Sequence, residues 1–232
     1  MFNLIKSELY KLRFDRILII LAAMIFAVGV NNFGLQTVAN GREAFTASTK
    51  DFVALFACAA YAGMTIGGDF SKRTIQKSVM AGHKRISVLV SKLLSYFVGC
   101  TILYIISTLF ITLPYVLALG WGVDFTNGEI RMIIGTMLLS VLFHLCTATI
   151  TFFIAFWIKE TGIATAVCLF IMLVLVLAMN NTGTADNMVA YAMSSGIALD
   201  KELIWQTITM SIIELCGGTV LAYLLFRKVE LK

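Results

Sequence analysis

Long apolar stretches separated by short polar ones dominate the pattern along the chain. Six stretches have the roughly 17 to 25 residues that an α-helix needs to cross the hydrocarbon of a bilayer. They cover residues 17–39, 52–68, 92–113, 132–158, 162–179 and 203–226. The pattern therefore predicts an all-α membrane protein with six transmembrane helices, in which residues 1–232 form a single transmembrane domain.

The composition agrees with this interpretation. The chain is 59% hydrophobic and 13% charged, and its mean hydropathy is +0.91. A soluble domain averages nearer half apolar and a quarter charged residues. We therefore expect many apolar side chains of this chain to contact the lipid of a bilayer. Residues 1–16 have a mixed-charge amphipathic pattern, and no small-residue cleavage site follows the first apolar stretch. We therefore expect that stretch to be a retained helix and not a signal peptide.

The Lys and Arg residues are divided unequally between the two sets of polar segments. Segments 1–16, 69–92, 159–160 and 227–232 hold 14 Lys and Arg residues against five acids. Segments 31–51, 120–131 and 180–203 hold four against seven. Cytoplasmic loops carry the basic excess in membrane proteins, so we expect both termini to be cytoplasmic. The net charge of +5 then lies beside anionic lipid headgroups, and we expect membrane lipids, not nucleic acid, to be its partners.

The N-terminal segment 1–16 is a candidate interfacial helix. Ile5, Leu9 and Leu12 have helical i, i+4, i+7 spacing, and its basic residues lie off that stripe. Such a helix, joined directly to a span, is expected in the plane of the inner headgroups. A simple topology-setting flank is the alternative, and the two interpretations are compatible.

The loop 69–91 also contains an amphipathic stretch. Its apolar side chains lie near one helical face: Phe70, Ile75, Val79 and Met80. Polar and basic side chains occupy the rest: Lys72, Arg73, Gln76 and Lys77. Gly82 is a natural C-terminal stop, and a second helical stretch from about Arg85 leads into the third span. A surface helix and a docking surface for a cytoplasmic partner both fit this pattern.

The order of residues in this loop resembles the first cytoplasmic loop of type-2 ABC exporter permeases. Asp69 is followed by basic residues, Thr74-Ile75, an apolar turn, a Gly-His-Lys-Arg break at 82–85 and Ser-Lys-Leu-Leu at 91–94. In that family the loop usually begins with Glu and reads through Gly-Thr-Ile or Gly-Thr-Leu, so Arg73 stands where Gly is common. Residues 6–13, Lys-Ser-Glu-Leu-Tyr-Lys-Leu-Arg, resemble the interfacial segment of the same family. The small size is most similar to permeases of bacterial peptide-antibiotic (lantibiotic or bacitracin-type) export and immunity.

The resemblance implies that a helix from about Asp69 to Ala81 docks in a groove of a separate ABC ATPase subunit. The docking residues would be Asp69, Phe70, Lys72, Arg73, Thr74, Ile75, Lys77 and Ser78. The chain has no Gly-x-x-x-x-Gly-Lys-Ser/Thr phosphate loop, so ATP and Mg would be bound by the partner, and we expect no cofactor here. The resemblance also implies a second permease chain, identical or not, a bacterial plasma membrane location, and short helices between the last two spans, in 180–203.

Two ionisable residues lie well inside the expected spans. His144 and Glu214 are each about 11 or 12 residues into spans that run in the same direction, so their depths should match. A charge at the centre of a membrane helix normally faces protein or water and finds a partner. They either pair with each other, within a chain or across a dimer, or each bonds a nearby Ser, Thr or backbone carbonyl.

Three further features concern packing. The five cysteines fall in five different spans without CxxC or Cys/His spacing, so we expect them to pack as small hydrophobes. Gly63, Gly67 and Gly68 favour close helix contacts, with a hinge as the alternative. Pro114 is expected to kink the outer end of the third span.

A transport subunit that moves an amphipathic substrate with a partner's ATP hydrolysis is the function that the pattern favours. An intramembrane enzyme needs paired acids, HExxH-like spacing or a Ser with a base at membrane depth, and this class is disfavoured because only one acid and one His lie deep, on separate helices. A non-transporting sensor or assembly partner shares the topology, and co-purification with an ATPase separates it from a transport subunit. The residues leave the substrate and the direction of transport open.

Overall fold

The computed structural model describes residues 2–32, 38–50 and 52–182, together with isolated positions between 205 and 224. All regular secondary structure in this described part is helical. The elements are α1 (Phe2–Leu12), α2 (Arg16–Asn32), α3 (Gly41–Lys50), α4 (Val53–Ala62), the π-helical turn η1 (Gly63–Gly67), α5 (Gly68–Ser71), α6 (Thr74–Met80), α7 (Arg85–Leu119), α8 (Asn127–Ile158) and α9 (Thr161–Thr182).

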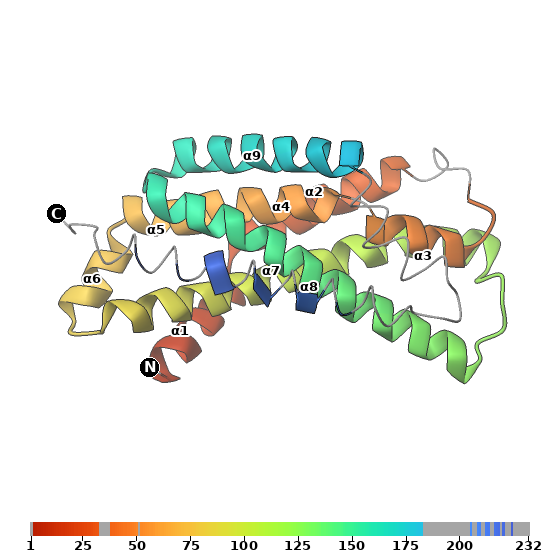
Figure 1. Cartoon of the computed structure of the whole chain (residues 1–232), viewed down its shortest axis with the longest axis horizontal. Helices are drawn as coiled ribbons and strands as arrows, with labels where there is room; N and C mark the ends of the chain where they lie inside the picture. The colour runs from red at the N-terminus through yellow and green to blue at the C-terminus, as the bar shows by residue number, and fades with distance from the viewer. Residues whose placement is uncertain are drawn as a thin grey trace.

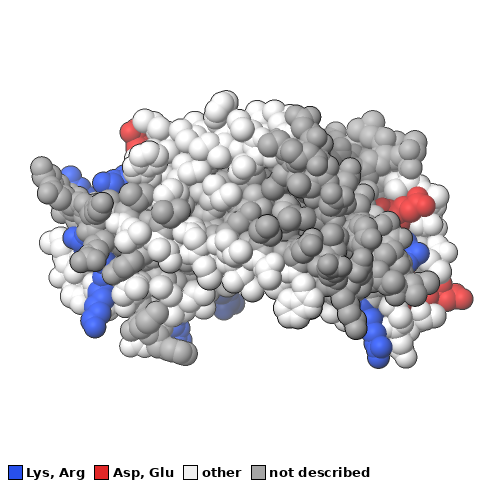
Figure 2. Space-filling view, in the orientation of Figure 1, with Lys and Arg blue, Asp and Glu red and all other residues white. Residues whose placement is uncertain are grey.

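The helices form an elongated bundle in which α4, α7, α8 and α9 run along the long axis (Figure 1). Helices α1 and α6 lie at one end of the bundle, and α3 lies at the other (Figure 1). Figure 2 shows Lys and Arg side chains gathered mainly at the end that carries α6, whereas the described residues in the middle of the visible face show almost no charge. We call the end with α1 and α6 the basic end, and the end with α3 the α3 end.

Three helical stretches in the described part are long and apolar enough to cross a membrane: Gly41–Ser71, Arg85–Leu119 and Asn127–Ile158. A fourth is added if Asn3–Leu12 and Arg16–Asn31, which are bent by 44°, count as one span. The 35 residues of α7 extend for about 52 Å, well beyond the ~30 Å of bilayer hydrocarbon. The prediction of an all-α protein with membrane-length helices is confirmed for these residues. For the expected sixth span, 203–226, the structure describes only isolated positions, and residues 183–202 of the loop before it lie outside the described residues.

Helix α7 does not end before Pro114, as the expected boundary at residue 113 required. It continues through Pro114 to Leu119 and stops at Gly120, which has a φ of 72°. Proline has no N–H, so the carbonyl of Phe110, four residues earlier, lacks its helical donor. Gly29 of α2 lies against that carbonyl, where a Cβ atom would be only 3.1 Å from the oxygen. Packing against α2 thus covers the weak point of the helix.

Glycines allow α9 to approach the α4–η1–α5 stretch closely. A Cβ atom on Gly63 would lie 2.3 Å from the Thr165 Cα atom, and one on Gly67 would lie 3.0 Å from the Thr161 Cα atom. At Gly68 the nearest atom is 3.9 Å away, so that glycine has room. The packing interpretation is therefore confirmed for Gly63 and Gly67, where any larger residue would push the two helices apart.

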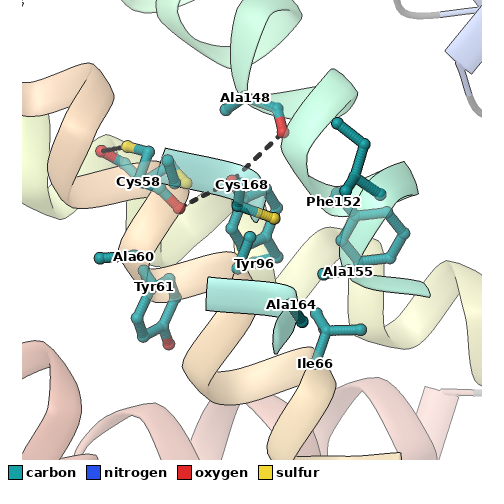
Figure 3. Close-up of a cluster of buried hydrophobic side chains, with 14 of the residues drawn as sticks. Cys58, Ala60, Tyr61, Ile66, Tyr96, Ala148, Phe152, Ala155, Ala164 and Cys168 are labelled. Carbon is teal, nitrogen blue, oxygen red and sulfur yellow. Dashed lines mark hydrogen bonds between the residues drawn. The ribbon is translucent and has the colours of Figure 1, made fainter. Parts of the chain in front are cut away.

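Tyr96 joins three helices at the centre of the core (Figure 3). Its hydroxyl lies 3.1 Å from the Cys58 carbonyl on α4, 3.2 Å from the Ala148 carbonyl on α8 and 3.0 Å from the Thr151 hydroxyl. The Tyr61 ring stacks on Tyr96 at 6.0 Å between centroids. Cys58, Cys100 and Cys168 pack in this core as small hydrophobes, in line with their expected role, and Cys58 and Cys168 appear in Figure 3. Cys146 is also buried, whereas Cys216 is exposed, contrary to that expectation.

Candidate functional site at the basic end

The site begins at the corner between α1 and α2. Asp15 accepts a hydrogen bond from the Ile17 backbone N–H at 3.0 Å and so caps the first turn of α2. Its second carboxylate oxygen accepts from the Tyr61 hydroxyl at 3.0 Å. One acidic residue therefore starts α2 and ties this corner to α4.

Lys92 of α7 joins α1 to α5 through two carboxylates. Its ammonium lies 2.6 Å from Glu8 Oε2 and 2.5 Å from Asp69 Oδ2. The side chains of Lys92, Glu8 and Asp69 are only 8%, 9% and 22% exposed. We call these three residues the Lys92 junction. Buried charges are tolerated when they are paired in this way, and removing one member leaves the others uncompensated.

Asp69 also determines how α6 leaves the bundle. The Thr74 hydroxyl lies 2.6 Å from Asp69 Oδ1 and 2.9 Å from the Asp69 carbonyl, which ties the start of α6 to α5. Arg73, between the two helices, has the left-handed conformation, with φ 58° and ψ 26°. The expected single helix from Asp69 to Ala81 is therefore two helices, because the backbone turns at Lys72 and Arg73. The expected stop at Gly82, with φ 87°, is observed.

The eight residues expected to dock an ATPase lie in three environments. Phe70 and Ile75 are buried, and the Phe70 ring packs edge-on to Phe156 at 5.1 Å. Asp69, Thr74 and Ser78 are partly buried and take part in hydrogen bonds inside this corner of the fold. The three cationic residues are exposed: Lys72, Arg73 and Lys77.

An exposed surface therefore remains on the outside of α6. It includes Met80, which is 85% exposed, and continues through Lys84 after the helix. We call Lys72, Arg73, Lys77, Met80 and Lys84 the α6 surface. It combines four basic residues with one large apolar side chain, a composition suited to an acidic partner that also offers an apolar contact.

A cavity of about 220 Å³ lies beside the Lys92 junction. Its lining includes the junction itself, Asp15, Tyr61 and apolar side chains from α1, α2 and η1. The carboxylates that line it have partners already, through Lys11, Lys92, Thr74, Tyr61 and the backbone. No group of three or more metal-ligating side chains occurs within the described ranges. The charged side chains at this end therefore connect α1, α2, α4, α5 and α7 to one another.

The intramembrane residues lie elsewhere. His144 is buried in the middle of α8, where its Nδ1 atom lies 2.8 Å from the Ser140 carbonyl. Of the two alternatives raised for His144, a backbone carbonyl partner is therefore present. Glu214 lies outside the described residues, so its pairing with His144 stays a prediction.

Sequence reasoning missed the contacts at the α3 end. Arg42 of α3 forms an ion pair with Glu129 of α8 at 2.8 Å. The Thr126 hydroxyl accepts from the Glu129 N–H at 3.4 Å. A Thr-x-x-Glu capping pattern at 126–129 was a readable signal for the start of α8, but not for the partner of Glu129.

Compared with protein-family models, curated protein sequences and solved structures, the chain matches none of them.

Proposed function

We propose that this chain is the transmembrane permease subunit of an ATP-driven ABC exporter in a bacterial plasma membrane. In this proposal six helices span the membrane, both termini and the basic end face the cytoplasm, and α6 docks on a separate ATPase. Two permease chains and two ATPase chains form the working unit, and the cargo is amphipathic: a peptide antibiotic, a lipid or a drug. The observation that carries the proposal is that α6 packs against the bundle on one side and is exposed on the other.

Helix α6 is fixed on its inner side and free on its outer side. Ile75 is fully buried, and Thr74 is bonded to Asp69, which in turn pairs with Lys92. The α6 surface faces away from these contacts. A partner that pushes on α6 would therefore displace α5 and the start of α7 together, because packed interiors transmit displacement instead of absorbing it.

The Lys92 junction extends this coupling to α1. Glu8 binds the same ammonium as Asp69, so α1, α5 and α7 share one charged contact. On its N-terminal side, α5 is continuous with η1 and α4, so the three form one uninterrupted helical stretch. A short turn with π-helical bonding inside a longer helix is a common feature of functional sites. The arrangement connects a small docking helix to α1 and to two membrane-length stretches, Gly41–Ser71 and Arg85–Leu119.

The backbone of Arg73 also supports the resemblance. Glycine is common at this position in type-2 ABC exporter permeases, and glycine adopts a positive φ without steric cost. Arg73 has a φ of 58°, so its departure from the family pattern affects the surface and not the path of the chain.

The experiment is affinity purification of the tagged chain in mild detergent, with its genomic neighbours co-expressed, followed by an ATPase assay. Lys77→Glu with Met80→Asp alters the α6 surface without touching a buried side chain. Arg131→Glu with Phe125→Asp is the matched control, because both residues are exposed and lie at the α3 end. We expect the α6 variant to reduce the recovered ATPase at least tenfold and the control to retain it.

Two results would count against the proposal. If the folded α6 variant retains as much ATPase as the control, the ATPase does not dock on the α6 surface. If the folded, unaltered chain brings down no nucleotide-binding partner, the transport role fails, and a sensor or assembly partner becomes the better account.

A further inference from the structure

Three buried polar side chains meet near the middle of α7 and α8. Tyr104 and Ser107 of α7 and His144 of α8 are only 1%, 2% and 3% exposed. The rings of Tyr104 and His144 lie 4.3 Å apart between centroids. Ser107 follows Tyr104 by three residues, so the two side chains lie on the same face of the helix.

Three polar atoms of these side chains have no partner with hydrogen-bond geometry among the described residues: Tyr104 Oη, Ser107 Oγ and His144 Nε2. The hydroxyls of Ser140 and Thr108 lie near Tyr104 Oη but outside hydrogen-bond geometry. Neighbouring hydroxyls on the same helices are satisfied. Thr108 donates to the Tyr104 carbonyl and Thr147 to the Phe143 carbonyl, both at 3.1 Å. A buried polar atom without a partner is costly and uncommon, and three in one place are a local exception.

The hydrogen-bonding character of the cluster follows from His144. Its Nδ1 atom lies 2.8 Å from the Ser140 carbonyl, which can only accept, so the ring proton of a neutral His144 is on Nδ1. Nε2 then has a free lone pair and accepts. The hydroxyls of Tyr104 and Ser107 each bring a proton. The cluster therefore offers one acceptor and two donors.

We propose that Tyr104, Ser107 and His144 form a binding site at membrane depth for a neutral O–H group. Such a group donates its proton to His144 Nε2 and accepts from the two hydroxyls. A neutral ligand fits because residues 93–119 and 132–158 contain no Asp, Glu, Lys or Arg, and an unpaired charge at this depth is costly. The O–H belongs to a buried water or to the hydroxyl of a bound molecule. The inference does not depend on the exporter proposal.

The first test uses the sign of a stability change. Tyr104→Phe removes only the hydroxyl, and Tyr96→Phe does the same at a fully buried tyrosine with three partners. If the site is occupied, both variants lower the Tm of the purified protein, each by at least about 2 °C. If the site is empty, Tyr104→Phe removes an unsatisfied group and raises the Tm while Tyr96→Phe still lowers it. That result overturns the proposal.

The second test identifies the occupant. The chain has two histidines, so a His83→Gln variant labelled with ¹⁵N-histidine reports on His144 alone. It is reconstituted in phosphatidylcholine–phosphatidylglycerol vesicles without added cargo and measured by solid-state NMR. A hydrogen-bonded Nε2 with a cross-peak to exchangeable water supports the site, with water as the occupant. A hydrogen-bonded Nε2 without that cross-peak, together with a co-purified hydroxyl compound found by mass spectrometry, supports it with a bound molecule.

Two outcomes of this measurement contradict the proposal. One is an Nε2 atom that accepts no hydrogen bond. The other is a hydrogen bond that disappears in a Glu214→Leu variant of normal stability, because the chain's own carboxyl group would then be the donor.

Discussion

Replacing Lys92 with methionine should expose how strongly the basic end depends on one buried ammonium. The substitution keeps an unbranched side chain of similar length but leaves the carboxylates of Glu8 and Asp69 without their shared cation. Both carboxylates are within 2.6 Å of the ammonium and are mostly buried. They would therefore have to remain charged in a poorly solvated place or take up protons.

The magnitude follows from burial. Breaking a fully buried ion pair by removing one partner costs roughly 3–5 kcal/mol. The Asp69 side chain is 22% exposed, so water compensates part of the loss, and we expect about 2–4 kcal/mol. At about 2–4 °C per kcal/mol for a chain of this size, the Tm should fall by on the order of 10 °C.

Lys11→Met is the matched control. Lys11 binds the same Glu8 side chain at the same distance, 2.6 Å, but is 61% exposed. An exposed ion pair contributes about 0–1 kcal/mol, so this variant should change the Tm by a few degrees at most. Both Tm values can be followed by intrinsic tryptophan fluorescence of the purified protein in one detergent.

A third variant tests the cause of the loss. Combining Lys92→Met with Glu8→Gln and Asp69→Asn removes all three charges, and replacement of a whole buried ionic group is often neutral or stabilising. The triple variant should recover most of the lost Tm. The reasoning is refuted if Lys92→Met and Lys11→Met have equal effects, or if the triple variant is less stable than Lys92→Met alone.

Two other substitutions test local features of the fold in the same Tm assay. Gly63→Ala should lower the Tm by several degrees, because the added Cβ atom would lie 2.3 Å from the Thr165 Cα atom. In the control Gly135→Ala, the added Cβ atom meets no described atom within 4 Å, so this variant should be tolerated. Equal effects on the Tm would mean that α9 can move away from Gly63 freely. Arg73→Gly should leave the free energy of unfolding unchanged or raise it by up to about 1 kcal/mol, with the Tm rising accordingly, because glycine adopts the left-handed backbone conformation without steric cost. Arg73→Val should lower the Tm. A higher Tm for Val than for Gly would show that Arg73 is not strained.

The long helices could be predicted because their signal is local. A run of apolar residues long enough to cross a bilayer indicates a helix whatever it packs against, and the predicted ranges 92–113, 132–158 and 162–179 lie within α7, α8 and α9. Helix α3 could not be found this way, because its ten residues are mostly polar. It is held by tertiary contacts, such as the 2.8 Å bond between Gly41 N and the Gly120 carbonyl.

The Lys92 junction was equally hidden. Glu8 and Lys92 are 84 residues apart, and charge counting treated both as flanking charges that mark one side of the membrane. Burial converts them into a structural contact, which depends on how α1 crosses α7. The partner of His144, by contrast, is four residues earlier on its own helix, so a local alternative was already available from the sequence.

The two-helix form of the 69–81 segment also depends on tertiary structure. Lys72 and Arg73 are adequate helix formers, and nothing in their sequence predicts a left-handed backbone. Asp69 accepts bonds from both Lys92 and Thr74, and these contacts turn the chain at Arg73. Burial of Phe70 and Ile75 follows from that turn, which leaves the basic residues for the α6 surface.

Site-specific photocrosslinking in cells tests the docking claim most directly. The photoreactive residue p-benzoylphenylalanine replaces Met80, which is 85% exposed, or, as the control, Phe125, which is 63% exposed at the α3 end. The account predicts a crosslink from position 80 to a nucleotide-binding ATPase and none from position 125. A folded chain that forms no such crosslink from position 80, or forms it equally from both positions, would contradict the assignment of α6 as the docking helix.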